Sequence, residues 1–206
     1  TGKGDKMQID LQMPMQLDKA VLNGQTLNYS RNGNAFFILI NNALPIGSTH
    51  TISLSYSGNV QVAVRPPWDG GWIFSKDKLG RPWMSVACQG LGASVWFPCK
   101  DHQGDEPDNG AILKINSADS LVAIGNGRLK NKTKSENYKT TWEWEVKNPI
   151  NNYNIIPYIG KYVSNVWVRK NVLRQTDEEI TDIDRQIKIE TGVDPDDADI
   201  NPDLMK

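Results

Sequence analysis

The stretch that decides the fold is HTISLSYSG, residues His50–Gly58, in which apolar and polar residues alternate from Ile52 onward. A period of two places Ile52, Leu54 and Tyr56 on one face of an extended strand and the serines on the other. MQIDLQM, residues Met7–Met13, repeats the pattern. Both stretches therefore predict β-strands with one buried face.

Turn signals separate further runs of the same kind. Asn23-Gly24 lies between Ala20–Leu22 and Thr26–Tyr29, and this dipeptide favours a tight hairpin because both of its residues tolerate positive φ. Other strand-like runs cover residues 35–40, 72–74, 83–88, 111–115, 121–124, 139–146 and 153–156. No stretch before residue 165 has helical periodicity. Short, regularly spaced strands predict an all-β fold, a mostly antiparallel β-sandwich or an open barrel.

The composition changes near residue 166. Val166–Lys206 holds six basic and eleven acidic residues, a net charge of −5. Thr176–Glu179 forms a capping box, and isoleucines then recur at i, i+3 and i+7 from Ile180. With Gly192 and Pro195 as stop signals, this pattern predicts a helix of about 15 residues and an acidic end. We therefore predict a β-domain over residues 1–165 and a helical, acidic tail over residues 166–206, whose relation to the β-domain stays open.

Composition and charge exclude several functions. The formal net charge is −1, which gives no electrostatic reason for binding nucleic acid or an anionic membrane. The longest apolar run, Ala35–Ile40, is far shorter than the roughly 18 residues of a membrane span. Cys88 and Cys99 make neither a disulfide scaffold nor a metal cluster, and free thiols are favoured over a disulfide. The compartment stays open, with a periplasmic or secreted location favoured over a cytoplasmic one.

Residues for hydrolytic chemistry are scarce. The chain has two histidines, His50 and His102, and lacks the His-Glu-x-x-His pattern of zinc hydrolases. His50 is interpreted as a structural or surface residue. The loop Lys100–Glu106 around His102 is either a cation site on carboxylate oxygens or a solvated turn, and the turn is favoured because no calcium-loop spacing is met. Gly125–Gly127 is interpreted as a tight turn. We expect no catalytic residue and no metal site in this chain.

Seven tryptophans are many for 206 residues. Six of them fall in two groups, of which the first is Trp68, Trp72, Trp83 and Trp96 and the second is Trp142 and Trp144. Such aromatics line sugar- or peptide-binding grooves in some proteins. The alternative, which we favour, is packing in the core or against another domain.

Two segments carry a resemblance to a known family. Ser85–Gly90 (SVACQG) with Val95–Asp101 (VWFPCKD) resembles the N-terminal domain of the zinc aminopeptidases related to leukotriene hydrolase and aminopeptidase N. The Asn-Gly turn within Leu121–Leu129 and the run Tyr138–Val163 resemble later strands of that domain. The resemblance covers about residues 7–163 and implies a fragment of a saddle-like, non-catalytic β-domain that packs on a zinc-bearing catalytic domain.

The resemblance also implies a binding residue. In that family a Gln or Glu at this position helps bind the free amino end of the substrate; here it is Gln89, with Gly90 beside it. An ordinary strand hydrogen-bonder is the alternative for Gln89. The implied partners are the catalytic domain of the parent enzyme and a peptide N-terminus, and the implied cofactor is zinc in that catalytic domain. The chain departs from the family in lacking its zinc motif and its Gly-x-Met-Glu-Asn motif.

Residues 168–180 resemble the C-terminal end of portal proteins from contractile-tailed phages, a family of a different class. Two alternative functions therefore stand beside the aminopeptidase domain. One is a stand-alone β-sandwich module that binds a peptide or a carbohydrate through its tryptophans. The other is a structural or assembly protein that depends on the tail.

Overall fold

The computed structural model describes residues 5–40, 44–45 and 47–162. The chain divides into two units, Thr1–Lys161 and Tyr162–Lys206, so the described residues other than Tyr162 belong to the first unit. The predicted C-terminal helix and acidic end lie outside the described residues, and the predicted boundary at residue 165 stays a prediction.

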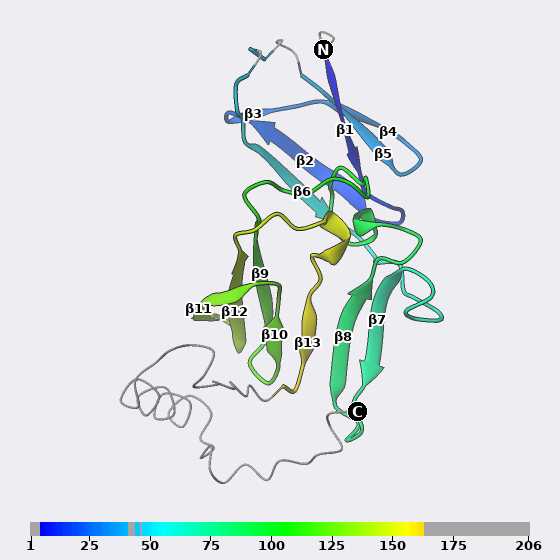
Figure 1. Ribbon diagram of the computed structural model, residues 1–206, viewed down its shortest axis with the longest axis vertical. Helices are drawn as coiled ribbons and strands as arrows, with labels where there is room; N and C mark the ends of the chain where they lie inside the picture. The colour runs from blue at the N-terminus through cyan, green and yellow to red at the C-terminus, as the bar shows by residue number, and fades with distance from the viewer. Residues whose placement is uncertain (1–4, 41–43, 46, 163–206) are drawn as a thin grey trace, which may run out of the picture. The chain divides into compact units, whose positions relative to one another are not determined.

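The described chain is built from thirteen strands and two short 3-10 helices (Figure 1). The strands of the first third are β1 (Lys6–Asp10), β2 (Gln16–Leu22), β3 (Gln25–Thr26), β4 (Tyr29–Asn32), β5 (Ala35–Leu39) and β6 (Ile52–Ser57). The remaining elements are β7 (Gly71–Lys76), β8 (Pro82–Ala87), η1 (Ala93–Val95), β9 (Ala111–Ala118), β10 (Val122–Ile124), β11 (Arg128–Ser135), β12 (Lys139–Val146), η2 (Asn152–Asn154) and β13 (Tyr158–Gly160).

The strands form four open sheets. Their orders are β1-β5-β4, β3-β2-β6, β10-β13-β8-β7 and β11-β12-β9. All pairs of named strands are antiparallel, and an isolated bridge between Val62 and Trp72 is parallel. The predicted all-β, antiparallel fold is confirmed, and none of the sheets closes on itself.

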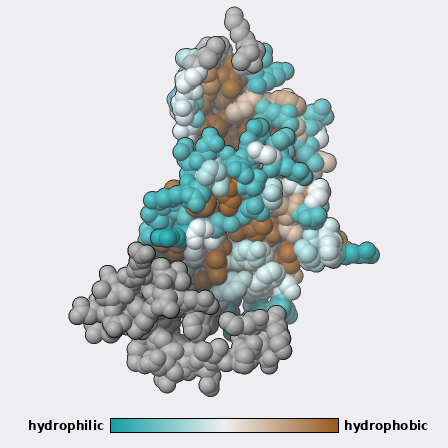
Figure 2. Space-filling view, in the orientation of Figure 1, coloured by the Kyte–Doolittle hydropathy of each residue, from teal (hydrophilic) through white to brown (hydrophobic). Residues whose placement is uncertain are grey.

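The first two sheets enclose an apolar core. Leu17, Ala20 and Leu22 of β2 and Phe36 and Ile38 of β5 lie buried in one cluster, joined by neighbouring loop residues. Alternation holds along β5 and from Ala20 to Leu22, because successive side chains of a strand point to opposite faces. A register shift just after Leu17 interrupts the alternation in β2. On the face of the molecule drawn in Figure 2, exposed apolar residues lie between hydrophilic ones.

Most predicted turns and strands appear where the sequence places them, with two corrections. The Asn23-Gly24 hairpin is confirmed, with φ of 51° and 81° at its two residues. The run Thr26–Tyr29 does not form one strand, because Thr26 is the last residue of β3 and Tyr29 is the first residue of β4. The predicted strand at residues 153–156 is wrong: Asn152–Asn154 forms η2, and pairing starts only at Tyr158, one residue after Pro157, which has no backbone N–H to donate.

No helix among the described residues is long and apolar enough to cross a membrane.

Candidate functional site

The turn after β8 carries the two residues singled out in the sequence. The backbone N–H groups of Leu91 and Gly92 both donate to the carbonyl of Cys88, at 3.2 and 2.8 Å. Gln89 and Gly90 therefore form the exposed tip of a tight turn. Gly90 has φ of 71°, a left-handed conformation that glycine adopts without strain. The structure thus places Gln89 beyond the strand, on a surface turn.

A carboxylate fixes the segment that follows this turn. The two oxygens of Asp101 accept the backbone N–H groups of Ala93 and Ser94 at 3.2 and 3.1 Å, at the start of η1. Gly92, with φ of 81°, lies so close that a Cβ there would be 2.2 Å from an Asp101 oxygen. Only glycine fits this position without a shift of its neighbours. Asp101 and Gly92 together set the path of the chain beyond the Gln89 turn.

The N-terminal strand holds the same segment from the other side. Asp10 and Cys99 exchange backbone hydrogen bonds of 2.8 and 3.1 Å, and the Asp10 carboxylate accepts the N–H of Asp101 at 3.1 Å. The buried Gln12 side chain donates to the carbonyl of Leu91 and to Ser94 Oγ. The segment from residue 88 to residue 101 is therefore anchored along its length rather than free on the surface.

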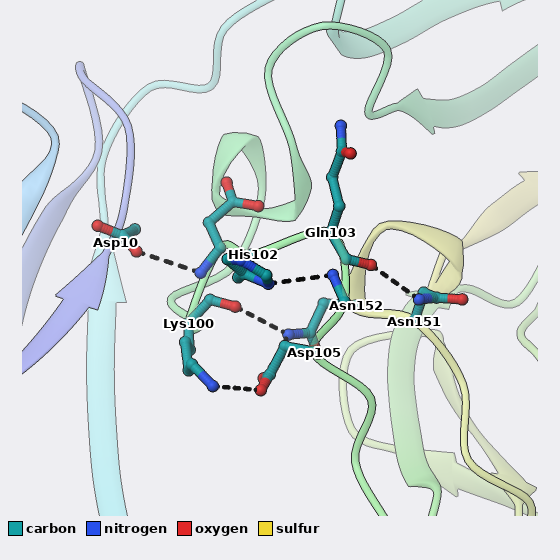
Figure 3. A network of polar contacts seen from close by, with 9 residues as sticks. Asp10, Lys100, His102, Gln103, Asp105, Asn151 and Asn152 are labelled. Atoms are coloured by element: carbon teal, nitrogen blue, oxygen red, sulfur yellow. Dashed lines mark hydrogen bonds and ion pairs between the residues drawn. The ribbon is translucent and has the colours of Figure 1, made fainter.

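A second loop, residues 100–106, is held by η2 (Figure 3). The buried Asn152 side chain donates to the carbonyl of Lys100 at 3.0 Å and to Asp105 Oδ2 at 3.2 Å. Asn151 donates to the carbonyl of Gln103 at 2.9 Å. Lys100 pairs with Asp105 at 2.6 Å, and this hydrogen bond is the main reason that the pKa of Asp105 lies below its usual value. The loop is a structured turn.

Two of the three carboxylates of this loop are already engaged. Asp101 caps η1 and Asp105 binds Lys100 and Asn152. His102 accepts the N–H of Gly104 on Nδ1, at 3.1 Å. Among the described residues, no group of three or more His, Cys, Asp or Glu side chains is placed to hold a metal ion. The residues present therefore do not fit a zinc site of the hydrolytic kind, which takes three protein ligands.

The two loops border one cavity of about 930 Å³. Gln89 and Gly90 of the first loop line it, as do His102 and Gln103 of the second. Trp83 and Tyr158, from β8 and β13, line it as well, and their ring centroids lie 6.4 Å apart. Among the described residues, the structure gives the exposed side-chain amide of Gln89 no hydrogen-bond partner. The cavity therefore combines an aromatic surface with polar groups that are free to bind a ligand.

Both cysteines are free thiols, as the sequence favours. Cys88 is half-buried at the cavity, and Cys99 is buried. Burial, with the nearby charge of Asp101, raises the pKa of Cys88 to about 11 and raises the pKa of Cys99 as well. Both groups stay protonated near neutral pH, so neither is an activated nucleophile.

The tryptophans divide by environment. Trp72 and Trp96 meet edge to face, with centroids 6.3 Å apart, in a half-buried aromatic cluster. Trp142 is 7% exposed and carries the Lys132 ammonium 4.5 Å from its ring centroid. Trp144 donates its indole N–H to the carbonyl of Ala123 at 2.9 Å. These four pack within the domain, whereas Trp83 lines the cavity and Trp68 is 82% exposed.

Sequence analysis did not single out the rest of the site. Asn152 lies fifty residues beyond His102 and Tyr158 lies on the strand beside β8, and both line the cavity. His50 lies outside it, exposed, with Nε2 2.6 Å from Ser48 Oγ. The Asn-Tyr pair at residues 152–153 belongs to the family resemblance, which was the one available signal for this part of the site.

Solved structures share this fold. The M1 zinc metallopeptidase from Deinococcus radiodurans matches with a TM-score of 0.60 and 19% identity over 76% of this chain and 34% of that one. A variant of that enzyme bound to a Tyr-Ser-Ala substrate matches with a TM-score of 0.62 and 20% identity over the same shares of the two chains. Native yeast LTA4 hydrolase matches with a TM-score of 0.56 and 15% identity, over 81% of this chain and 25% of that one.

The chain thus has the fold found in part of these metallopeptidases and spans about a third of the length of the first of them. A family model of the T4-like phage portal protein (Gp20) matches residues 130–190, less than half of the chain. No curated protein sequence matches the chain.

Proposed function

We propose that the chain is the non-catalytic N-terminal domain of a zinc aminopeptidase and packs on the catalytic domain of that enzyme. The shared fold supports this proposal, as does the position of the family-like segments. SVACQG forms the end of β8 and its turn, and VWFPCKD ends at Asp101, the residue that fixes the segment after that turn. The first segment lines the cavity along its whole length, and the second, separated from it by four residues, reaches the cavity through Asp101.

Within this proposal Gln89 helps to hold the free amino end of a peptide. The observation that carries the assignment is the exposed Gln89 amide, unpaired within the described chain at the edge of the cavity. An amide oxygen accepts a hydrogen bond from an ammonium group, although more weakly than a carboxylate does. Gly90 lets the turn present this side chain without a bulky neighbour. Zinc, held by the catalytic domain, would polarise the scissile carbonyl and activate water.

The first test is the metal content and aminopeptidase activity of the purified chain, measured with and without added zinc. We expect no stoichiometric zinc and no turnover, because no ligand set for zinc exists within the described residues. Bound zinc together with hydrolysis would contradict the proposal. A periplasmic or secreted location remains part of the same proposal and is tested by fractionating cells that produce the protein.

The second test concerns Gln89. The chain should bind peptides with a free amino end weakly, and Gln89→Ala should lower that affinity about three- to tenfold, the value of one lost hydrogen bond. Gln89→Glu should retain or raise the affinity, because a carboxylate pairs more strongly with an ammonium group. Gln25→Ala removes an exposed glutamine of β3, which does not line the cavity, and serves as the control. Equal losses for Gln89→Ala and Gln25→Ala, or full affinity for an N-acetylated peptide, would contradict the role of Gln89.

An assembly function is a second candidate, supported by the portal model that matches residues 130–190. It predicts a stable oligomer that is lost when residues 166–206 are deleted. Sedimentation velocity of the two chains decides it, and a monomer in both cases would remove this candidate.

A stand-alone binding module is the third candidate, supported by the exposed Trp68 and by Trp83 at the cavity. It predicts changes in tryptophan fluorescence with a carbohydrate or peptide ligand, with no need of a catalytic partner. If Trp83→Ala leaves those changes intact, the cavity is not the binding site of such a module.

A further inference from the structure

The loop of residues 100–106 is more ordered than its composition suggests. Residues 100–106 include four charged side chains, yet η2 binds three separate points of the loop through Asn151 and Asn152. The backbone of Asn152 also donates to the carbonyl of Asp105, at 3.4 Å. A loop held in this way presents its side chains in one arrangement before any ligand arrives, which lowers the entropy cost of binding.

The bond from Gly104 sets the orientation of the His102 ring. Its Nδ1 accepts the Gly104 N–H at 3.1 Å, so a neutral ring carries its proton on Nε2. His102 is exposed and lines the cavity, and no described residue is recorded as a partner of its Nε2. His102 therefore offers one fixed N–H donor in the cavity that also holds Gln89.

The other groups of this loop do not compete for that role. Lys100 and Asp105 bind each other, and Asp101 is engaged with η1. In Figure 3 the Gln103 side chain extends away from the hydrogen-bonded network, and its backbone carbonyl is the atom that binds Asn151. Of the side chains on this loop, His102 is the donor that is both oriented and unoccupied within the described chain.

We propose that His102 is a second peptide-binding residue, which donates from Nε2 to a backbone carbonyl beyond the first residue of a peptide whose amino end lies at Gln89. The identity of the ligand rests on the proposed function, whereas the oriented donor is a property of this loop. Because Gln89 and His102 lie on different loops of the same cavity, we expect a tripeptide to reach both residues and a single amino acid held at Gln89 to reach Gln89 alone. His102 therefore makes binding depend on peptide length.

The test compares two ligands of different length, tyrosine amide and the tripeptide Tyr-Ser-Ala, by calorimetry and amide chemical-shift titration on the full chain. His102→Ala should lower tripeptide affinity about three- to tenfold and leave the affinity for tyrosine amide unchanged. His102→Gln, which keeps a side-chain donor, should restore part of the loss. Gln25→Ala, on an exposed residue of β3 that does not line the cavity, should alter neither affinity.

The outcomes separate the two proposals. If Gln89→Ala weakens both ligands while His102→Ala weakens neither, the role of Gln89 stands and the role of His102 is overturned. If His102→Ala weakens only the tripeptide while Gln89→Ala has no effect, the reverse holds. Equal losses of both ligands with His102→Ala, accompanied by a lower melting temperature, would mean that the ring only supports the loop, which also overturns the inference. Absence of binding of either ligand at millimolar concentration overturns it for this chain.

Discussion

The two loops that border the cavity are held in different ways. The Gln89 loop, residues 88–92, depends on backbone conformation: two glycines with positive φ and a carboxylate that receives backbone N–H groups. The His102 loop, residues 100–106, depends on side-chain amides that come from η2, about fifty residues later. The first loop should therefore be disturbed when a glycine is replaced by a larger residue. The second should be disturbed when an asparagine amide is removed. The cavity requires both, so each loop can be disturbed separately.

The largest expected effect comes from Gly92→Ala. Its left-handed backbone with extended ψ is nearly restricted to glycine, and the added Cβ would meet Asp101. We expect the free energy of unfolding to fall by about 3 kcal/mol, from the strain and the displaced carboxylate together. Urea unfolding measures it.

Gly90→Ala is the matched control for this prediction. It also has positive φ, yet a Cβ there would meet nothing within 4 Å. It should cost only about 1 kcal/mol, the strain of the left-handed conformation alone. Equal costs at the two glycines would show that contact with Asp101 does not shape the Gln89 loop.

A smaller effect is expected from Asn152→Ala. Asn152 is 6% exposed and its amide satisfies the carbonyl of Lys100 and one oxygen of Asp105. Its removal takes away the donor to Asp105 Oδ2 and one of the two donors to the Lys100 carbonyl, which keeps the N–H of His102, so stability should fall by about 2 kcal/mol. Hydrogen exchange of amides in residues 100–106 should rise more than that of residues 88–92.

Asn151→Ala, which removes one bond from a more exposed residue, should cost less than half as much. If Asn152→Ala accelerates exchange equally in both loops, the two loops are one cooperative unit and the comparison fails.

The smallest expected effect is on the pH dependence of stability, through Cys88 in the Gln89 loop. The pKa of Cys88 is raised to about 11 from an ordinary value near 9, mainly because burial disfavours the thiolate. Between pH 9 and 11 the folded chain therefore keeps a thiol proton that the unfolded chain loses. The contribution of Cys88 to the free energy of unfolding is complete below pH 9 and is lost as the pH rises towards 11. Urea midpoints between pH 8 and 10.5 should fall less steeply for Cys88→Ala than for the natural chain.

Cys99 and Tyr56, whose pKa values burial also raises, contribute the same downward slope to both chains and cancel in the difference. Identical slopes for the natural chain and Cys88→Ala would mean that the Cys88 thiol is better solvated at the cavity than its burial indicates.

The alternation of apolar and polar residues made much of the fold predictable. The segments that were predicted wrongly or not at all lack this alternation. β6 alternates strictly and was predicted within two residues at either end. β11 was not predicted, because all eight of its residues are exposed and it has no buried face to produce a pattern. Residues 153–156 have the apolar composition of a strand, but Asn152 starts a 3-10 turn there and Ile155 is buried without strand pairing.

The site was predictable in part. Gln89 and Gly90 came from the resemblance, and the structure brings them to a cavity, while their role in binding stays a prediction. The Asn152 network could not be predicted, because its amide binds backbone atoms of Lys100, fifty-two residues away. Nothing in the local sequence marks a bond that exists only after the chain has folded. The same holds for His102, whose ring orientation depends on a backbone N–H two residues later.

The anchoring of the Gln89 segment on β1 has a consequence for the order in which the protein is made. Asp10 binds Asp101 across 91 positions of sequence, so 91 further residues must leave the ribosome after Asp10 before β1 can complete this contact. Contacts of such long range close late and slow folding. β1 can pair with β5 much earlier, but its contact with the Gln89 segment forms late. A chain that lacks β1 would lose the support of the cavity while keeping every residue that lines it.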